Sequence, residues 1–180
     1  MTCVIFDRFE RTVYADSYVV DTGVWRKMKG RKKASLGFFC GNPCIYGVAG
    51  DIDYLPVFQA HYENVATMSQ ALTTWPSHIP RDKVEFGILC ANADFFYVSD
   101  SAWDLDPGPH LILGTGRPYA LTAMHLGKRP MEALRAARDL ADGTEGPFFT
   151  WRLQDKKGFF NGGASIKREF KIEGTNWVEV

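Results

Sequence analysis

The order of β-rich and helical segments constrains the fold of this chain more than any other feature of its sequence. Residues Thr2–Phe6 are apolar and β-rich, and a second β-rich run, Thr12–Ala15, follows a short polar stretch. Two such runs so close together predict a β-hairpin at the start of the chain. Two further runs, Lys33–Phe39 and Ile45–Ala49, flank the turn signal Gly41-Asn42-Pro43. The sequence therefore predicts a mainly antiparallel sheet.

The pattern changes to helical spacing in the middle of the chain. Between Asp53 and Pro76, apolar residues recur every three or four positions, which predicts a helix with one buried face. The rest of the chain is expected to form strands at 84–90, 95–99 and 110–113, helices at 117–126 and 131–141, and strands at 148–152 and 166–180. This order indicates an α+β fold with two sheets packed face to face between helices. At 180 residues the chain has the size of a single domain, 1–180.

Charge and hydropathy exclude several classes of protein. The 21 Lys and Arg residues balance the 21 Asp and Glu residues, so the chain lacks the net positive charge of a general nucleic-acid binder. Six basic residues lie between Arg26 and Lys33, but such a run is usually solvated, and only Trp25 could stack on a base. No apolar run approaches the roughly 18 residues of a membrane span, and the N-terminus lacks the layout of a signal peptide. We therefore expect a cytoplasmic protein without a membrane partner.

The cysteines and histidines give no sign of a metal site. The four cysteines, Cys3, Cys40, Cys44 and Cys90, contain no Cys-x-x-Cys pair, and no histidine lies near Cys40 and Cys44 in the sequence. The four histidines are scattered without metal-ligand spacing. Reduced and mostly buried thiols are the expected state.

Thr2 is the first candidate for chemistry. Removal of Met1, which the small threonine side chain permits, would leave Thr2 with a hydroxyl nucleophile and a free α-amine. The reference pKa of such an amine, about 8, suits a general base at neutral pH. Many chains begin Met-Thr, so Thr2 needs partners to carry a function. Cys3 would be an alternative nucleophile only after removal of two residues.

A series of short motifs follows Thr2 in a fixed order. They are Ala15-Asp16-Ser17, Thr22-Gly23, Lys32-Lys33, Ala49-Gly50 and Gly114-Thr115-Gly116. This series resembles that of the active subunits of the proteasome family, particularly the bacterial proteasome-like peptidase that works with a ring ATPase. The resemblance covers about residues 2–150, and the ordered set is much more specific than any one motif.

The resemblance implies a role for each matching residue. Thr2 matches the nucleophile, and Asp16 matches a buried aspartate that orients a lysine. Lys33 matches that lysine because it lies ten residues after Gly23, and Lys32 misses the family's spacing by one residue. A cation near the hydroxyl and amine favours their deprotonated forms, and Asp16 would hold the cation in place.

Three more residues are implied by the same resemblance. Gly50 matches the glycine whose backbone N–H stabilises the oxyanion. Thr115 replaces the serine of the family's Gly-Ser-Gly motif and keeps a hydroxyl for the amine to bond. Asp142, in the stretch 142–146, matches the first residue of a later family loop.

The fold implied by the resemblance is the four-layer α-β-β-α sandwich of N-terminal nucleophile hydrolases, with two antiparallel sheets. The implied activity is threonine-type cleavage of peptide bonds in peptides or unfolded proteins, with no metal or organic cofactor. The implied assembly is a homo-oligomeric ring, with an ATPase as partner.

Some features depart from the family and keep other hypotheses open. Glu145 replaces a serine beside the nucleophile, and a carboxylate there would favour the protonated amine. The stretch 51–84 is short for the family's two long helices: one helix includes His61 to Val65, and only a truncated successor fits before Pro76. The strand-rich segment 158–180 has no counterpart in the family. One alternative is therefore a catalytically silent assembly or binding protein with this fold. Another is an amidase that uses the same site on small molecules.

Overall fold

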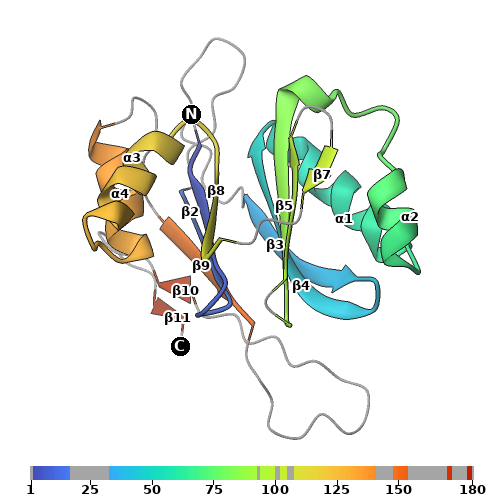
Figure 1. Cartoon of the computed structure of the whole chain (residues 1–180), viewed down its shortest axis with the longest axis horizontal. Coiled ribbons are helices and arrows are strands. Elements are labelled where there is room, and N and C mark those ends of the chain that lie inside the picture. The colour runs from blue at the N-terminus through green and yellow to red at the C-terminus, as the bar shows by residue number, and fades with distance from the viewer. Residues whose placement is uncertain are drawn as a thin grey trace, which may run out of the picture.

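The computed structural model describes residues 2–16, 33–92, 94–99, 102–104, 108–140, 148–153, 170–171 and 178–179. Within these residues the chain forms two large antiparallel sheets, with two helices against the outer face of each (Figure 1). The layers follow one another as helices, sheet, sheet and helices. The α+β sandwich expected from the sequence is confirmed.

The first sheet has four strands in the order β8-β1-β2-β9. Its strands are β1 (Val4–Asp7), β2 (Thr12–Asp16), β8 (His110–Leu113) and β9 (Phe148–Arg152). The predicted hairpin β1–β2 pairs Ile5 with Tyr14, and β1 also pairs Ile5 with Ile112 of β8. The N-terminal strand is therefore central in this sheet, which fixes the position of the residues just before it.

The second sheet has five strands in the order β3-β4-β5-β6-β7. Its strands are β3 (Ala34–Phe39), β4 (Asn42–Gly50), β5 (Val84–Cys90), β6 (Phe95–Ser99) and β7 (Ala102–Asp104). The short strand β7 was not expected from the sequence. A separate pair of two-residue strands, β10 (Phe170–Lys171) and β11 (Val178–Glu179), falls within the predicted C-terminal segment, most of which lies outside the described residues.

Helices cover the outer face of each sheet. The helices α1 (Leu55–Glu63) and α2 (Met68–Thr73) pack on the five-stranded sheet, and α3 (Arg117–His125) and α4 (Pro130–Leu140) pack on the four-stranded sheet (Figure 1). Short 3-10 turns at Ile52–Tyr54 and Arg81–Lys83 connect this region to its strands. The longest described helix has eleven residues, and no described helix is both long and apolar enough to span a bilayer.

The helical region expected from Asp53 to near Pro76 consists of two helices in the structure. The helix α1 ends at Glu63, and α2 begins separately at Met68. The Thr67 side chain accepts the N–H of Gln70 at 3.3 Å. This side-chain bond caps a new helix, so the chain restarts helical structure instead of continuing it. The second helix has only six residues, in agreement with the truncated successor expected from the sequence.

Three apolar clusters hold the four layers together. Along β1, Val4 and Phe6 point into the cluster between the sheets, whereas Ile5 points to the cluster under α3 and α4. The third cluster lies between the five-stranded sheet and α1 and α2. The strands are thus apolar on both faces, because each sheet is covered on both sides.

The Phe6 ring needs two glycines in the opposite sheet. Gly47 and Gly87 are register partners on β4 and β5. A Cβ atom at Gly47 would lie 2.5 Å from Phe6 Cζ, and one at Gly87 would lie 3.0 Å from it. The missing side chains therefore make room for the ring and let the two sheets approach closely.

Asp7, at the end of β1, contributes a pH-dependent contact to the fold. Its carboxylate accepts the N–H of Glu10 at 2.9 Å and lies 3.5 Å from His110 Nε2. Burial raises the pKa of Asp7, but its hydrogen bonds, above all with His110, outweigh burial and hold it below its ordinary value. The resulting stability is present above the pKa of the unfolded carboxyl and is lost as the pH falls through the lower folded pKa.

We predict that Asp7→Asn lowers the free energy of unfolding by about 1 kcal/mol at pH 7. The difference from the wild type should shrink between about pH 5 and pH 2, because acid protonates the wild-type carboxyl. Urea unfolding of both proteins over this range provides the measurement. A difference that does not change with pH would contradict the assignment to the Asp7 charge.

Candidate functional site

Thr2 lies just before β1, where the backbone of a glycine turn holds it. Its carbonyl oxygen accepts the N–H of Gly116 at 3.1 Å, and the residue is only 8% exposed. A Cβ atom at Gly114 would lie 2.2 Å from this oxygen, and Gly114 has a φ of +89°. Gly114 is therefore required both by its backbone conformation and by the close approach of Thr2. The structure places Thr2 at the junction of β1, β8 and α3.

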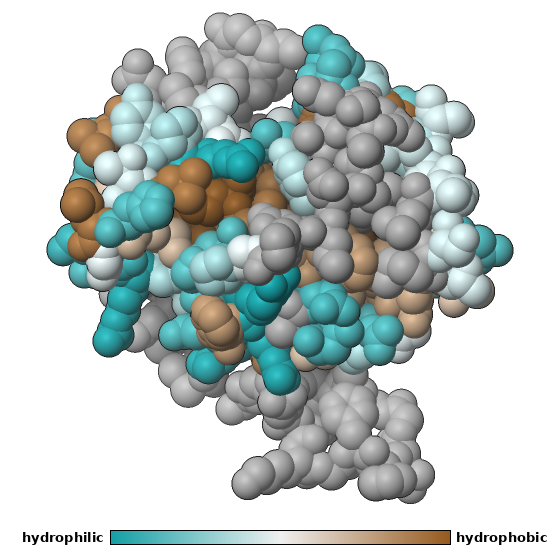
Figure 2. Space-filling model, in the orientation of Figure 1, coloured by the Kyte–Doolittle hydropathy of each residue, from teal (hydrophilic) through white to brown (hydrophobic). Residues whose placement is uncertain are grey.

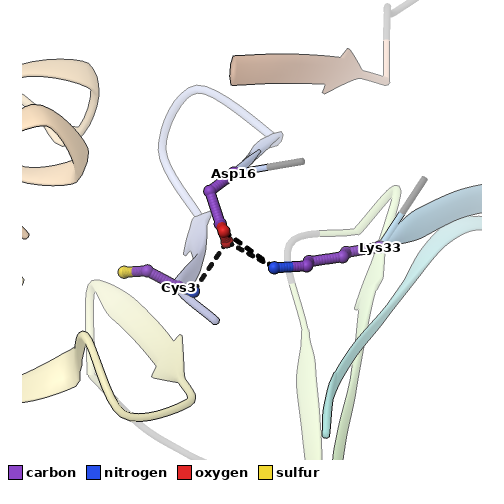
Figure 3. A network of polar contacts seen from close by, with 3 residues as sticks. All are labelled: Cys3, Asp16 and Lys33. Atoms are coloured by element: carbon purple, nitrogen blue, oxygen red, sulfur yellow. Dashed lines mark hydrogen bonds and ion pairs between the residues drawn. The ribbon is translucent and has the colours of Figure 1, made fainter. Parts of the chain in front are cut away.

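A buried ion pair lies next to this residue. The Lys33 ammonium donates to both carboxylate oxygens of Asp16 at 2.8 Å, and both side chains are 0% exposed. The backbone N–H of Cys3 donates to Asp16 Oδ1, also at 2.8 Å. Figure 3 shows the Asp16 carboxylate between the Cys3 nitrogen and Lys33 Nζ. The carboxylate therefore links the chain directly after Thr2 to the lysine.

The pair also joins the two sheets. Asp16 is the last residue of β2 in the four-stranded sheet, and Lys33 directly precedes β3 in the five-stranded sheet. The Lys33 carbonyl oxygen accepts the N–H of Val48 at 2.9 Å, which fixes the backbone of the lysine. Lys33 belongs to the basic run of the sequence, yet it is buried and not solvated as such runs usually are. Residues 26–32 lie outside the described residues.

Burial is the largest influence on the pKa values of Lys33 and Cys3. It lowers the pKa of Lys33, and the Asp16 carboxylate offsets only part of this effect. Burial, together with the Asp16 charge, raises the pKa of the Cys3 thiol, and Lys33 only partly opposes the shift. A thiol with a raised pKa stays protonated and is a poor nucleophile. The environment therefore disfavours Cys3 as the alternative nucleophile.

Gly50, the residue matched to the oxyanion donor, ends β4 and is exposed. It pairs with Val84 of β5 and has a φ of +104°. A Cβ atom there would lie 2.3 Å from the carbonyl oxygen of Lys83. Both the backbone conformation and the crowding by Lys83 require glycine at this strand end.

We predict that Gly50→Ala costs more stability than Gly41→Ala. Gly41 also has a positive φ, +76°, but a Cβ atom there would meet nothing within 4 Å. The Gly41 variant should therefore lose about 1 kcal/mol through backbone strain alone, and the Gly50 variant about 2–3 kcal/mol. Guanidinium unfolding of the two variants measures the difference. Equal losses would show that the contact with Lys83 does not constrain Gly50.

Of the remaining predicted residues, the structure describes only Thr115. Thr115 is exposed on the turn between β8 and α3, beside Gly114 and Gly116. Asp142 lies outside the described residues, as do Gly23, Lys32 and Glu145. The structure thus brings together Thr2, Asp16 and Lys33, and it places Gly50 and Thr115 at nearby strand ends.

One residue of this region, Glu85, was not predicted from the sequence to belong to the site. Its Oε2 atom accepts the N–H of Gly114 at 2.5 Å. Glu85 is the one charged residue in the strand Val84–Cys90, and a single charge in an otherwise apolar strand was the signal that could have found it.

Comparisons with solved structures identify the class of fold. The chain is similar to BPH from Thiobacillus denitrificans in complex with epoxomicin, with 13% identity, 86% of this chain and 100% of that chain covered, and a TM-score of 0.60. It is similar to the eukaryotic HslV from Trypanosoma brucei, with 15% identity, coverages of 83% and 97%, and a TM-score of 0.58. It is also similar to Anbu, an ancestral β-subunit from Yersinia bercovieri, with 13% identity, coverages of 84% and 80%, and a TM-score of 0.62.

The fold is therefore the sandwich of the N-terminal nucleophile hydrolases. More particularly, it is the form found in proteasome-like β-subunits, as expected from the resemblance. No family model and no curated protein matches the sequence.

Proposed function

We propose that this chain is a threonine-type N-terminal nucleophile hydrolase that cleaves peptide bonds. The observation that carries the proposal is the buried Asp16–Lys33 pair, which is bonded to the backbone N–H directly after Thr2. A buried ion pair stabilises a fold weakly, or not at all, relative to apolar residues of similar size. Its position beside a hydroxyl residue at the start of a central strand supports a catalytic role.

In the proposed reaction, processing removes Met1 and leaves Thr2 with a free α-amine. Thr2 Oγ bonds to the carbonyl carbon of the substrate while its proton passes to the amine, directly or through water. The peptide C–N bond then breaks, and the leaving amine takes that proton. Water hydrolyses the resulting ester and regenerates the hydroxyl.

The other residues would support these steps. Lys33, whose pKa is lowered by burial, would stabilise the developing negative charge on Oγ, and Asp16 would keep it in position. The Gly50 N–H would receive the oxyanion. The Thr115 hydroxyl would bond the free amine, and Asp142 is included in the site by the resemblance alone. No cofactor enters this scheme.

The proposal extends to assembly. Leu121 on α3, Leu126 at its end and Leu140 on α4 are exposed apolar side chains. Figure 2 shows apolar side chains on the side of the molecule where Figure 1 places α3 and α4. Exposed apolar patches mark interaction sites. They support assembly, and we propose a homo-oligomeric ring. The proposed cytoplasmic location, unfolded-protein substrate and ATPase partner rest on the resemblance alone.

Intact-mass measurement of the native protein, combined with an assay on fluorogenic peptides, tests this function. We expect a mass without Met1 and measurable peptide hydrolysis. Retained Met1 in a hydrolytically inactive protein would overturn the proposal. That outcome would favour the silent assembly protein, which the shortness of α2 also suggests.

A threonine-directed electrophile would extend the same test. Epoxomicin is bound in the solved structure of the Thiobacillus denitrificans neighbour. If Thr2 of this chain has the proposed free amine and activated hydroxyl, epoxomicin should modify it.

A further inference from the structure

Glu85 carries a second polar link between the two sheets, separate from the Asp16–Lys33 pair. It lies on β5 of the five-stranded sheet, and its carboxylate accepts the N–H of Gly114 at the end of β8, in the four-stranded sheet. A bond from a backbone N–H to a carboxylate is stronger than one between neutral groups.

The turn held by this bond is the one that holds Thr2. Gly114 and Gly116 lie two residues apart, and the Gly116 N–H donates to the Thr2 carbonyl oxygen at 3.1 Å. A Cβ atom at Gly116 would also lie 2.8 Å from Cys3 Cβ. The turn therefore packs directly against the backbone of Thr2 and Cys3, and a shift of the turn would move both residues.

Glu85 also lies beside the strand that leads to Gly50. It pairs in register with Ala49, the residue directly before Gly50. The position of a Cβ atom at Gly114 is 3.2 Å from Ala49 Cβ. Glu85 thus belongs to the strand pair β4–β5, in which β4 ends at Gly50. Its carboxylate forms a hydrogen bond with the turn that contacts Thr2.

We propose that Glu85 is a positioning residue for catalysis. Its carboxylate fixes the turn from Gly114 to Gly116, and through this turn it sets the distance between Thr2 and Gly50. The inference rests on the proposed function, because it assigns Thr2 as nucleophile and Gly50 as oxyanion donor. The essential feature is the hydrogen bond to Gly114, since Glu85 acts through the turn and not on the substrate.

Two substitutions separate the hydrogen bond from the charge. In Glu85→Gln the amide oxygen can still accept the Gly114 N–H, whereas Glu85→Ala removes the acceptor. We expect the Gln variant to keep kcat within about threefold of the wild type. We expect the Ala variant to lose about 10- to 100-fold in kcat with little change in KM, because a small misplacement of reacting groups has effects of this size.

Glu132→Ala is the matched control. The Glu132 carboxylate also accepts a backbone N–H, that of Arg129 at 2.9 Å, but it lies at the start of α4 and is exposed. The control should lose stability without losing kcat. An Ala variant of Glu85 with wild-type kcat would overturn the proposal, as would equal losses in the Gln and Ala variants, or a loss expressed in KM alone.

Hydrogen exchange tests the positioning independently of activity. The Gly116 amide, which is bonded to Thr2, should exchange faster in Glu85→Ala than in the wild type or in Glu85→Gln. If the wild type hydrolyses no peptide but this pattern appears, the proposed function fails and the structural role of Glu85 stands. If exchange at Gly116 is the same in all three proteins, the positioning role fails, whatever the activity.

Discussion

Thr2→Ala is expected to reduce peptide hydrolysis by about three orders of magnitude or more, because it removes the proposed nucleophile. The contacts that hold Thr2 in the fold are made by its backbone, through the carbonyl bond to Gly116 and the close approach of Gly114. The substitution should therefore leave the melting temperature nearly unchanged. Initial rates on a fluorogenic peptide, combined with thermal unfolding, give both quantities.

Thr122→Ala is a suitable control for this experiment. Thr122 lies on the exposed face of α3, where its hydroxyl donates to the Pro118 carbonyl at 2.9 Å. This variant should keep wild-type activity. If Thr2→Ala hydrolysed the peptide at a rate within a few-fold of the control, Thr2 would not be the nucleophile, and the proposed mechanism would be wrong.

Lys33→Met is expected to have the largest effect on stability. It leaves the Asp16 carboxylate buried without its cation, and breaking a buried ion pair in this way costs about 3–5 kcal/mol. The Cys3 N–H still donates to Asp16, but a backbone donor does not replace the positive charge of the ammonium. The free energy of unfolding in guanidinium measures the loss. Peptide hydrolysis should be lost in the same variant.

Two further variants show whether this effect arises from the buried pair. Lys83→Met removes a lysine 3.6 Å from Asp82, where both side chains are largely exposed; it should change stability by less than about 1 kcal/mol. The double variant Asp16→Asn with Lys33→Met should regain much of the stability, because no buried charge is left unpaired. A double variant as unstable as Lys33→Met would contradict this reading.

The strand order was largely predictable from the sequence because each strand is short, apolar and bounded by turn residues. The hairpin β1–β2, the pair β3–β4 and the strand β5 fall close to where β-rich runs were expected. The position of the break between α1 and α2 was not predicted, since the apolar period continues to Val65 and α1 ends at Glu63. It depends on the cap that Thr67 supplies to α2.

The candidate site also contains features that the sequence predicts and features that it does not. The pairing of Asp16 with Lys33 could be anticipated only because an ordered series of motifs resembled a known family. Residue type alone placed Lys33 in a solvated basic run. The lone charge of Glu85 in an apolar strand could mark it as unusual, but its contact could not be predicted, because its partner Gly114 is 29 residues away and follows a strand of the other sheet. The crowding of Gly50 by the Lys83 carbonyl likewise appears only when β4 and β5 are paired.

Covalent modification by epoxomicin, followed by peptide mapping, tests the central claim most directly. The protein should gain one adduct located on Thr2, in a chain that has lost Met1. Thr2→Ala should remain unmodified, and Thr122→Ala should react like the wild type. A protein that retains Met1 and stays unmodified, or one whose adduct maps to a residue other than Thr2, would contradict the assignment of Thr2 as the nucleophile.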